Sequence, residues 1–183
     1  MIRKIQLPLT PESARDLRAG EEVLLSGSVL TGRDQACRRL YDLLESAQPL
    51  PVDLAGQLVY FVGPSPARPG EVVGSAGPTT SGRMNAFMPR LLEAGVRGFL
   101  GKGYLAEEVK SALQTRGGVY LGAIGGTGAL LAQSITACEV IAFPELLSEA
   151  VHRMSFLDFP AIVLNDAAGG DLYAAAQAAS SKS

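Results

Sequence analysis

Three neighbouring hydroxyl side chains, Thr79, Thr80 and Ser81, are the residues of this chain best placed to do chemistry. They follow a Gly-Pro pair and precede Gly82 and Arg83, at the start of an apolar, helix-like segment. One hydroxyl is enough to cap a helix, so three in a row leave at least one for a ligand. A threonine hydroxyl can take part in proton transfer only where a nearby cation stabilises its oxyanion, because its pKa lies far above neutrality. The stretch therefore predicts a site for a negatively charged ligand.

Three cationic side chains, Arg33, Arg83 and Lys102, stand after predicted strands or at the start of predicted helices. The carboxyl ends of strands in an α/β sheet are where ligands usually bind, and helix N-termini there add free N–H groups. The planar fork of arginine suits a carboxylate, since it can bind both oxygens. The alternative is three solvated charges on separate loops. Together with the hydroxyl cluster, the pattern favours an anion site.

Composition excludes several other classes of protein. The net charge of −2 gives no overall attraction to nucleic acid or to a membrane surface. The apolar runs are too short to cross a bilayer, and the N-terminus lacks the pattern of a signal peptide, so we expect a cytoplasmic protein. Two cysteines, Cys37 and Cys138, and a single histidine, His152, predict neither a disulfide framework nor a metal site within this chain. The Gly-rich stretch "GAIGGTGALL" does not satisfy the dinucleotide-binding spacing.

Strand-like and helix-like segments alternate along most of the chain. Strands are predicted at residues 1–7, 21–32, 58–64, 96–103, 118–126, 138–143 and 161–166. Helices are predicted at residues 10–20, 33–47, 83–93, 105–113 and 127–135, with Pro89 expected to kink or restart the third. This order predicts an α/β fold with a mixed central sheet flanked by helices. We expect one domain over residues 1–183, with residues 174–183 as a disordered tail.

Four sequence strings resemble one family of enzymes. They are "GPTTSGRM" at residues 77–84, "GSVLTGRDQACRRL" at 27–40, "PVDLAGQLVYFVGP" at 51–64 and "GKG" at 101–103. They resemble the C-terminal, or β, part of the iron–sulfur hydro-lyases, namely class I fumarase and L(+)-tartrate dehydratase. The stretch at residues 138–166 is similar too, so the resemblance covers nearly the whole chain.

The resemblance implies half of an active site. In that family a swivelling β/β/α domain closes over an α part whose three cysteines hold a [4Fe–4S] cluster with one open iron. That iron acts as a Lewis acid while water is added to or removed from a four-carbon dicarboxylate. By this resemblance the chain is a β subunit that needs a cluster-bearing α subunit, in an α2β2-type or other oligomer. Fumarate and malate are the leading substrates. L(+)-tartrate and a stand-alone dicarboxylate-binding module without catalysis remain open as alternatives.

The resemblance also implies roles for particular residues. Thr79 corresponds to the proposed catalytic base. The substrate carboxylates would be held by Arg33, Thr80, Arg83 and Lys102, and the chain itself would supply no metal ligand. Three positions depart from the family pattern: Cys37 replaces a histidine, Asn85 replaces an acidic residue, and the string "YFVGP" lacks a histidine found in tartrate dehydratases.

Overall fold

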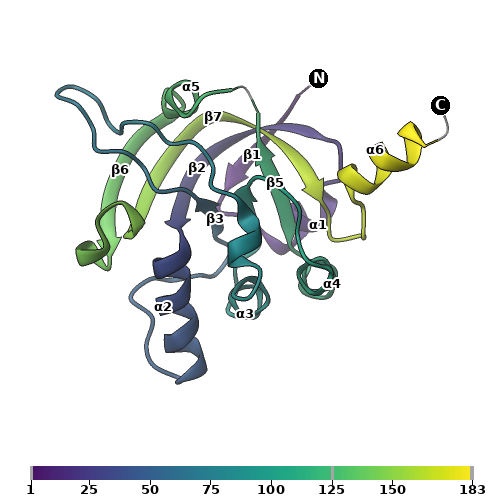
Figure 1. Cartoon of the computed structure of the whole chain (residues 1–183), viewed down its shortest axis with the longest axis horizontal. Helices are drawn as coiled ribbons and strands as arrows, with labels where there is room; N and C mark the ends of the chain where they lie inside the picture. Colours follow the sequence, from purple (N-terminus) through teal and green to yellow (C-terminus); the bar gives the residue numbers. More distant parts are fainter. Residues whose placement is uncertain (1, 125, 182–183) are drawn as a thin grey trace.

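A computed structural model describes residues 2–124 and 126–181 as a curled sheet with helices packed around it (Figure 1). The strands are β1 (Arg3–Leu7), β2 (Glu22–Gly32), β3 (Leu58–Phe61), β4 (Gly98–Gly101), β5 (Val119–Ala123), β6 (Ile135–Ala142) and β7 (Val151–Asn165). The α-helices are α1 (Pro11–Asp16), α2 (Asp34–Glu45), α3 (Met88–Glu93), α4 (Glu107–Arg116), α5 (Gly128–Ala132) and α6 (Leu172–Ser180). Two 3-10 helices are η1 (Ser81–Met84) and η2 (Pro144–Glu149).

The sheet is mixed and closes on itself. Strands β1 to β5 lie side by side in chain order and are parallel to one another. The long strand β7 is antiparallel to both β5 and β2, and β6 pairs with its first half. Because β7 bridges β5 and β2, strands β2, β3, β4, β5 and β7 form a closed ring. The predicted α/β class with a mixed central sheet flanked by helices is confirmed.

Two apolar cores lie on opposite faces of the parallel strands. Strand β3 contributes Leu58 and Tyr60 to the core inside the ring, and Val59 and Phe61 to the core under the helices. Successive side chains of a strand point to opposite faces, so a strand buried on both faces is apolar throughout. Helices α2, α3 and α4 cover the second core along one side of the sheet (Figure 1).

Strand β7 differs most from its prediction, because it begins ten residues before the predicted strand at 161–166. Its inward-facing residues change phase at a β-bulge, where Leu25 pairs with Phe159 but Gly27 pairs with Phe156. Asp158 lies in the bulge with a φ of +49°, and its backbone N–H donates to Ser26 Oγ at 2.9 Å. The bulge breaks the alternation of period two that identifies a strand in a sequence.

The C-terminal segment also differs from its prediction. The composition predicts a disordered tail from residue 174, whereas the structure has helix α6, whose first turn is capped by the side chain of Asp171. Residues 182–183 of that predicted tail, and Gly125 of the predicted strand 118–126, lie outside the described residues. The predicted helix 83–93 is interrupted as expected, since α3 restarts at Met88 with Pro89 in its first turn.

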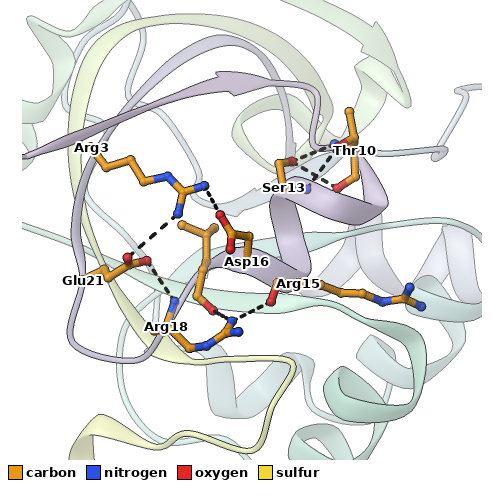
Figure 2. A network of polar contacts seen from close by, with 8 residues as sticks. Arg3, Thr10, Ser13, Arg15, Asp16, Arg18 and Glu21 are labelled. Atoms are coloured by element: carbon orange, nitrogen blue, oxygen red, sulfur yellow. Dashed lines mark hydrogen bonds and ion pairs between the residues drawn. The ribbon is translucent and has the colours of Figure 1, made fainter.

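Helix α1 shows how local sequence signals fix an element. Thr10 and Ser13 form a reciprocal capping box, and Pro11 occupies the first helical position. Figure 2 shows the polar contacts beyond this cap, in which Arg3 binds Asp16 at 2.6 Å and lies 3.9 Å from Glu21. These contacts tie β1 to α1 and to the start of β2. No helix within residues 2–124 and 126–181 is both long enough and apolar enough to cross a membrane.

Candidate functional site

The predicted site residues gather at the carboxyl ends of the parallel strands. Arg33 directly follows β2, and Lys102 directly follows β4. The hydroxyl segment is held at the ends of the two strands beside it. The N–H of Thr79 donates to the carbonyl of Phe61 at the end of β3, at 2.7 Å, and the N–H of Ser81 donates to the carbonyl of Lys102, at 2.9 Å. A loop of irregular structure, residues 62–80, therefore returns to the edge from which it left.

The three hydroxyls have different environments. Ser81 is fully buried, and its Oγ lies 2.9 Å from the hydroxyl of Tyr120, which in turn lies 3.0 Å from the carbonyl oxygen of Gly103. Thr79 is half-buried and Thr80 is exposed. Thr80, the residue before η1, makes no capping hydrogen bond with its side chain. Ser81 instead anchors the segment, which leaves the hydroxyls of Thr79 and Thr80 for a ligand.

The guanidinium groups of Arg33 and Arg83 face the same carboxylate. Arg83 Nε lies 2.9 Å from Asp34 Oδ1, and Arg33 Nε lies 3.8 Å from Asp34 Oδ2. Asp34 is the first residue of α2, and Arg33 is the residue that precedes this helix. The predicted convergence of these two arginines is therefore observed, and the carboxylate between them is an addition that the sequence interpretation missed.

A second carboxylate approaches Arg33 from η2. Glu149 Oε1 lies 3.7 Å from Arg33 Nε, beyond hydrogen-bond distance, and within the described residues this buried Nε has no hydrogen-bond partner. The Arg33 side chain lies across Gly63, where a Cβ would come within 2.8 Å of both Cδ and Nη1. Glycine at this position thus gives Arg33 its place at the end of β3.

Lys102 is exposed beside the hydroxyl segment, because Thr80 and Lys102 form an isolated parallel bridge next to β4. Within residues 2–124 and 126–181, Lys102 takes part in no ion pair. The structure thus brings Lys102 to Thr80, and Arg33 to Arg83, along one edge. A pocket of about 730 Å³ lies elsewhere, between residues 65–75 and helix α5, and none of the five predicted site residues lines it.

The residues beneath the site are apolar or neutral. Cys37 is fully buried next to Gly32, and burial, followed by the nearby charges of Asp34 and Glu149, raises the pKa of its thiol to about 12. His152 is buried in β7, and burial lowers the pKa of its imidazole. The residues that the structure describes contain no group of three side chains able to hold a metal ion.

Fold and site define an α/β domain with a cationic, hydroxyl-bearing edge at the carboxyl ends of its parallel strands. The chain belongs to the Fumarase C-terminus family, whose model matches residues 2–176.

The relatives described here differ in how much of their own length this chain covers. It is 38% identical over 151 residues to a class I, aerobic fumarate hydratase of Escherichia coli, and 37% identical over 156 residues to fumarate hydratase 2 of Leishmania major. These alignments cover 81% and 84% of this chain but only 28% of each relative. It is also 34% identical over 171 residues to the "Putative L(+)-tartrate dehydratase subunit beta" of Methanocaldococcus jannaschii, covering 90% of this chain and 88% of that protein. The chain thus spans about 28% of the length of the fumarate hydratases that it matches.

Proposed function

We propose that this chain is the β subunit of a two-subunit, [4Fe–4S]-dependent hydro-lyase that reversibly adds water to, or removes it from, a four-carbon dicarboxylate. Fumarate and malate are the leading substrate pair, and L(+)-tartrate is the alternative. The similarity to class I fumarate hydratases and to a protein named as a β subunit supports the reaction class and the division into two polypeptides.

The observation that carries this proposal is the convergence of Arg33 and Arg83 beside the segment that contains Thr79. Two guanidinium groups at one edge suit a ligand with two carboxylates, since each arginine can bind both oxygens of one group. Lys102 and Thr80, joined by their backbone bridge, would bind the same ligand from the side of β4. A monocarboxylate would leave part of this charge without a partner.

Thr79 is the proposed base of the reaction. Its backbone is fixed at the end of β3, and its side chain is half-buried, which places this residue at the site edge. The arginines and Lys102 supply the positive charge that a threonine oxyanion needs for stabilisation. In the proposed reaction Thr79 Oγ1 exchanges a proton with the substrate carbon, while the cationic side chains hold the carboxylates.

The cysteines of this chain do not fit a [4Fe–4S] cluster, which needs three or four thiolates. The thiol of Cys37 is buried and its pKa is raised, and burial raises the pKa of Cys138 as well, so both favour the protonated thiol. Cys138 lies on β6, away from the site edge. We therefore assign the cluster to a partner α subunit.

The rest of the proposal concerns the assembly. Residues 1–183 would act as one domain that swivels onto the partner, within an α2β2-type or other oligomer in the cytoplasm. Two unpaired cysteines are compatible with a reducing compartment. Asp34 and Glu149 offset part of the positive charge at the edge, which favours half of a shared site over a free-standing module that binds dicarboxylates tightly.

The decisive experiment is anaerobic reconstitution. The chain is co-expressed with a polypeptide that carries three cluster-ligand cysteines, and hydratase activity is measured on fumarate, malate and tartrate. We expect activity only when both polypeptides are present. Absence of activity on every four-carbon diacid would count against the proposal. Calorimetry on the chain alone tests the alternative function. Tight dicarboxylate binding without a partner would favour the stand-alone module.

A further inference from the structure

We propose that Asp34 is a positioning residue whose carboxylate lies between both substrate-binding arginines and keeps their guanidinium groups at the site edge, so that the terminal nitrogens of each fork remain available for substrate. This inference deepens the proposed function and rests on it for the identity of the ligand. The contacts of Asp34 with the two arginines belong to this chain and do not depend on which ligand binds.

The first support is the direction of approach. Arg83 Nε lies 2.9 Å from Asp34 Oδ1, and Arg33 Nε lies 3.8 Å from the other oxygen of the same carboxylate, so Asp34 is within ion-pair distance of both guanidinium groups without a hydrogen bond to Arg33 Nε. Arg33 and Arg83 make no side-chain hydrogen bond among the described residues through their terminal nitrogens. A guanidinium whose terminal nitrogens are not engaged in this way presents both of them, which is the pair that a carboxylate needs for bidentate binding.

The second support is the rigidity of the helix that carries Asp34. Asp34 begins helix α2, whose buried face includes Ala36, Cys37 and Leu40 packed in the core beneath the site. The side chain is short and about one third exposed, whereas that of Arg83 is 54% exposed. A short side chain on a packed helix loses little freedom, so it can fix a longer and more exposed partner.

The third support is the position of the two arginines in the chain. Arg33 precedes α2 and Arg83 belongs to η1, so no shared element sets their separation. Asp34 is the described side chain that contacts both of them. Glu149 approaches Arg33 alone, from η2. Asp34 therefore determines how far apart two carboxylate-binding groups lie, and this separation decides which dicarboxylates fit.

Asp34 could also stabilise helix α2 without positioning the arginines, and an experiment must distinguish these two roles. An acidic residue in the first turn of a helix also interacts favourably with the helix dipole, whatever its other neighbours. The double variant Asp34→Asn with Gln35→Glu distinguishes the two roles. It restores an acidic residue to the first turn, at an exposed position, without restoring the carboxylate between the arginines. Asp42→Asn is the matched control, since it removes an exposed charge from the same helix.

The first readout uses the chain alone. Nitrogen-15 spectra of the arginine Nε–H groups, assigned with Arg33→Lys and Arg83→Lys, report the contact directly. We expect Asp34→Asn to shift the Arg83 signal and speed its exchange with water, the double variant to do the same, and Asp42→Asn to leave it unchanged. An Arg83 signal that is identical in Asp34→Asn and the unmodified chain, or that the double variant restores, would overturn the proposal.

The second readout uses the reconstituted two-subunit enzyme. Asp34→Asn and the double variant should both raise KM for the dicarboxylate about tenfold, with a smaller change in kcat, because pre-organised ground-state binding is lost. Equal KM values for Asp34→Asn and the unmodified enzyme would overturn the proposal, as would recovery of KM in the double variant. If the unmodified pair hydrates no diacid, the proposed function fails, and the spectra of the chain alone still decide the role of Asp34.

Discussion

Arg33 and Arg83 come from different segments of the chain, yet the Nε atoms of both lie within ion-pair distance of the carboxylate of Asp34, at 3.8 Å and 2.9 Å. The two positive guanidinium groups repel each other. The carboxylate between them offsets that repulsion while no substrate is bound. The pair is thus assembled before a ligand arrives, and the ordering cost that a ligand must meet on binding is reduced accordingly.

Removal of Arg83 tests whether this pair binds substrate. Arg83→Gln should weaken transition-state binding by about 2–5 kcal/mol, the range for losing one partner of a desolvated charge pair, and should be measured as kcat/KM of the reconstituted enzyme. Arg68→Gln is the control, since Arg68 is an exposed arginine of the irregular loop 62–80. Equal losses in both variants would show that overall charge, rather than this site, attracts the substrate.

Thr79 can be tested with an isosteric side chain. Thr79→Val removes the hydroxyl and keeps the shape, so kcat should fall by about 10²–10⁴, the usual contribution of general acid–base catalysis, with little change in KM. Thr115→Val, at an exposed position on α4, should leave kcat unchanged. A Thr79→Val enzyme with normal kcat would assign the proton transfer to another group.

Much of the fold could be predicted because its signals are local. Thr10 and Pro11 mark the start of α1, and the apolar run of β3 reports burial on both faces. The first ten residues of β7 escaped prediction because the bulge at Asp158 shifts its inward side from Met154 and Phe156 to Phe159 and Ala161. A period-two pattern that changes phase does not read as one strand.

The cationic residues of the site were predicted from the sequence, and its two carboxylates were not. Arg33, Arg83 and Lys102 follow strands or precede helices, which is a signal readable from sequence order. Asp34 adjoins Arg33 and could have been identified from its place at the start of a helix. Glu149 could not have been identified from the sequence, because the conformation of η2 brings it to Arg33. That conformation includes a positive φ at Leu147, a residue type that does not indicate such a backbone in a sequence.

The anchoring of the hydroxyl segment leads to a prediction with a matched pair of glycines. A Cβ at Gly101 would collide with the Oγ of Ser81, whereas a Cβ at Gly82 would meet nothing within 4 Å. Gly101→Ala should therefore lower the free energy of unfolding by about 1–3 kcal/mol, as other overpacked sites do, and should reduce activity by moving Thr79. Gly82→Ala should change stability by about 0.5 kcal/mol or less. Urea unfolding measures both, and equal stability of the two variants would contradict this anchoring role.

Cys37 links the packing beneath the site to alkaline stability. Its thiol pKa is raised to about 12 in the folded chain, first by burial and then by Asp34 and Glu149, whereas an exposed thiol has a pKa near 9. Below pH 9 both states hold the proton. Between pH 9 and 12 the unfolded chain releases it while the folded chain keeps it, so stability falls as pH rises, by up to about 1.4 kcal/mol per pH unit.

Urea midpoints between pH 7 and 11 should therefore decline less steeply in Cys37→Ala than in the unmodified chain. Cys138→Ala is the control, because that thiol is only half-buried and should affect the slope less. Parallel pH profiles for Cys37→Ala and the unmodified chain would mean that the thiol ionises as freely in the folded state as in the unfolded one, which its burial on the inner face of α2 should prevent.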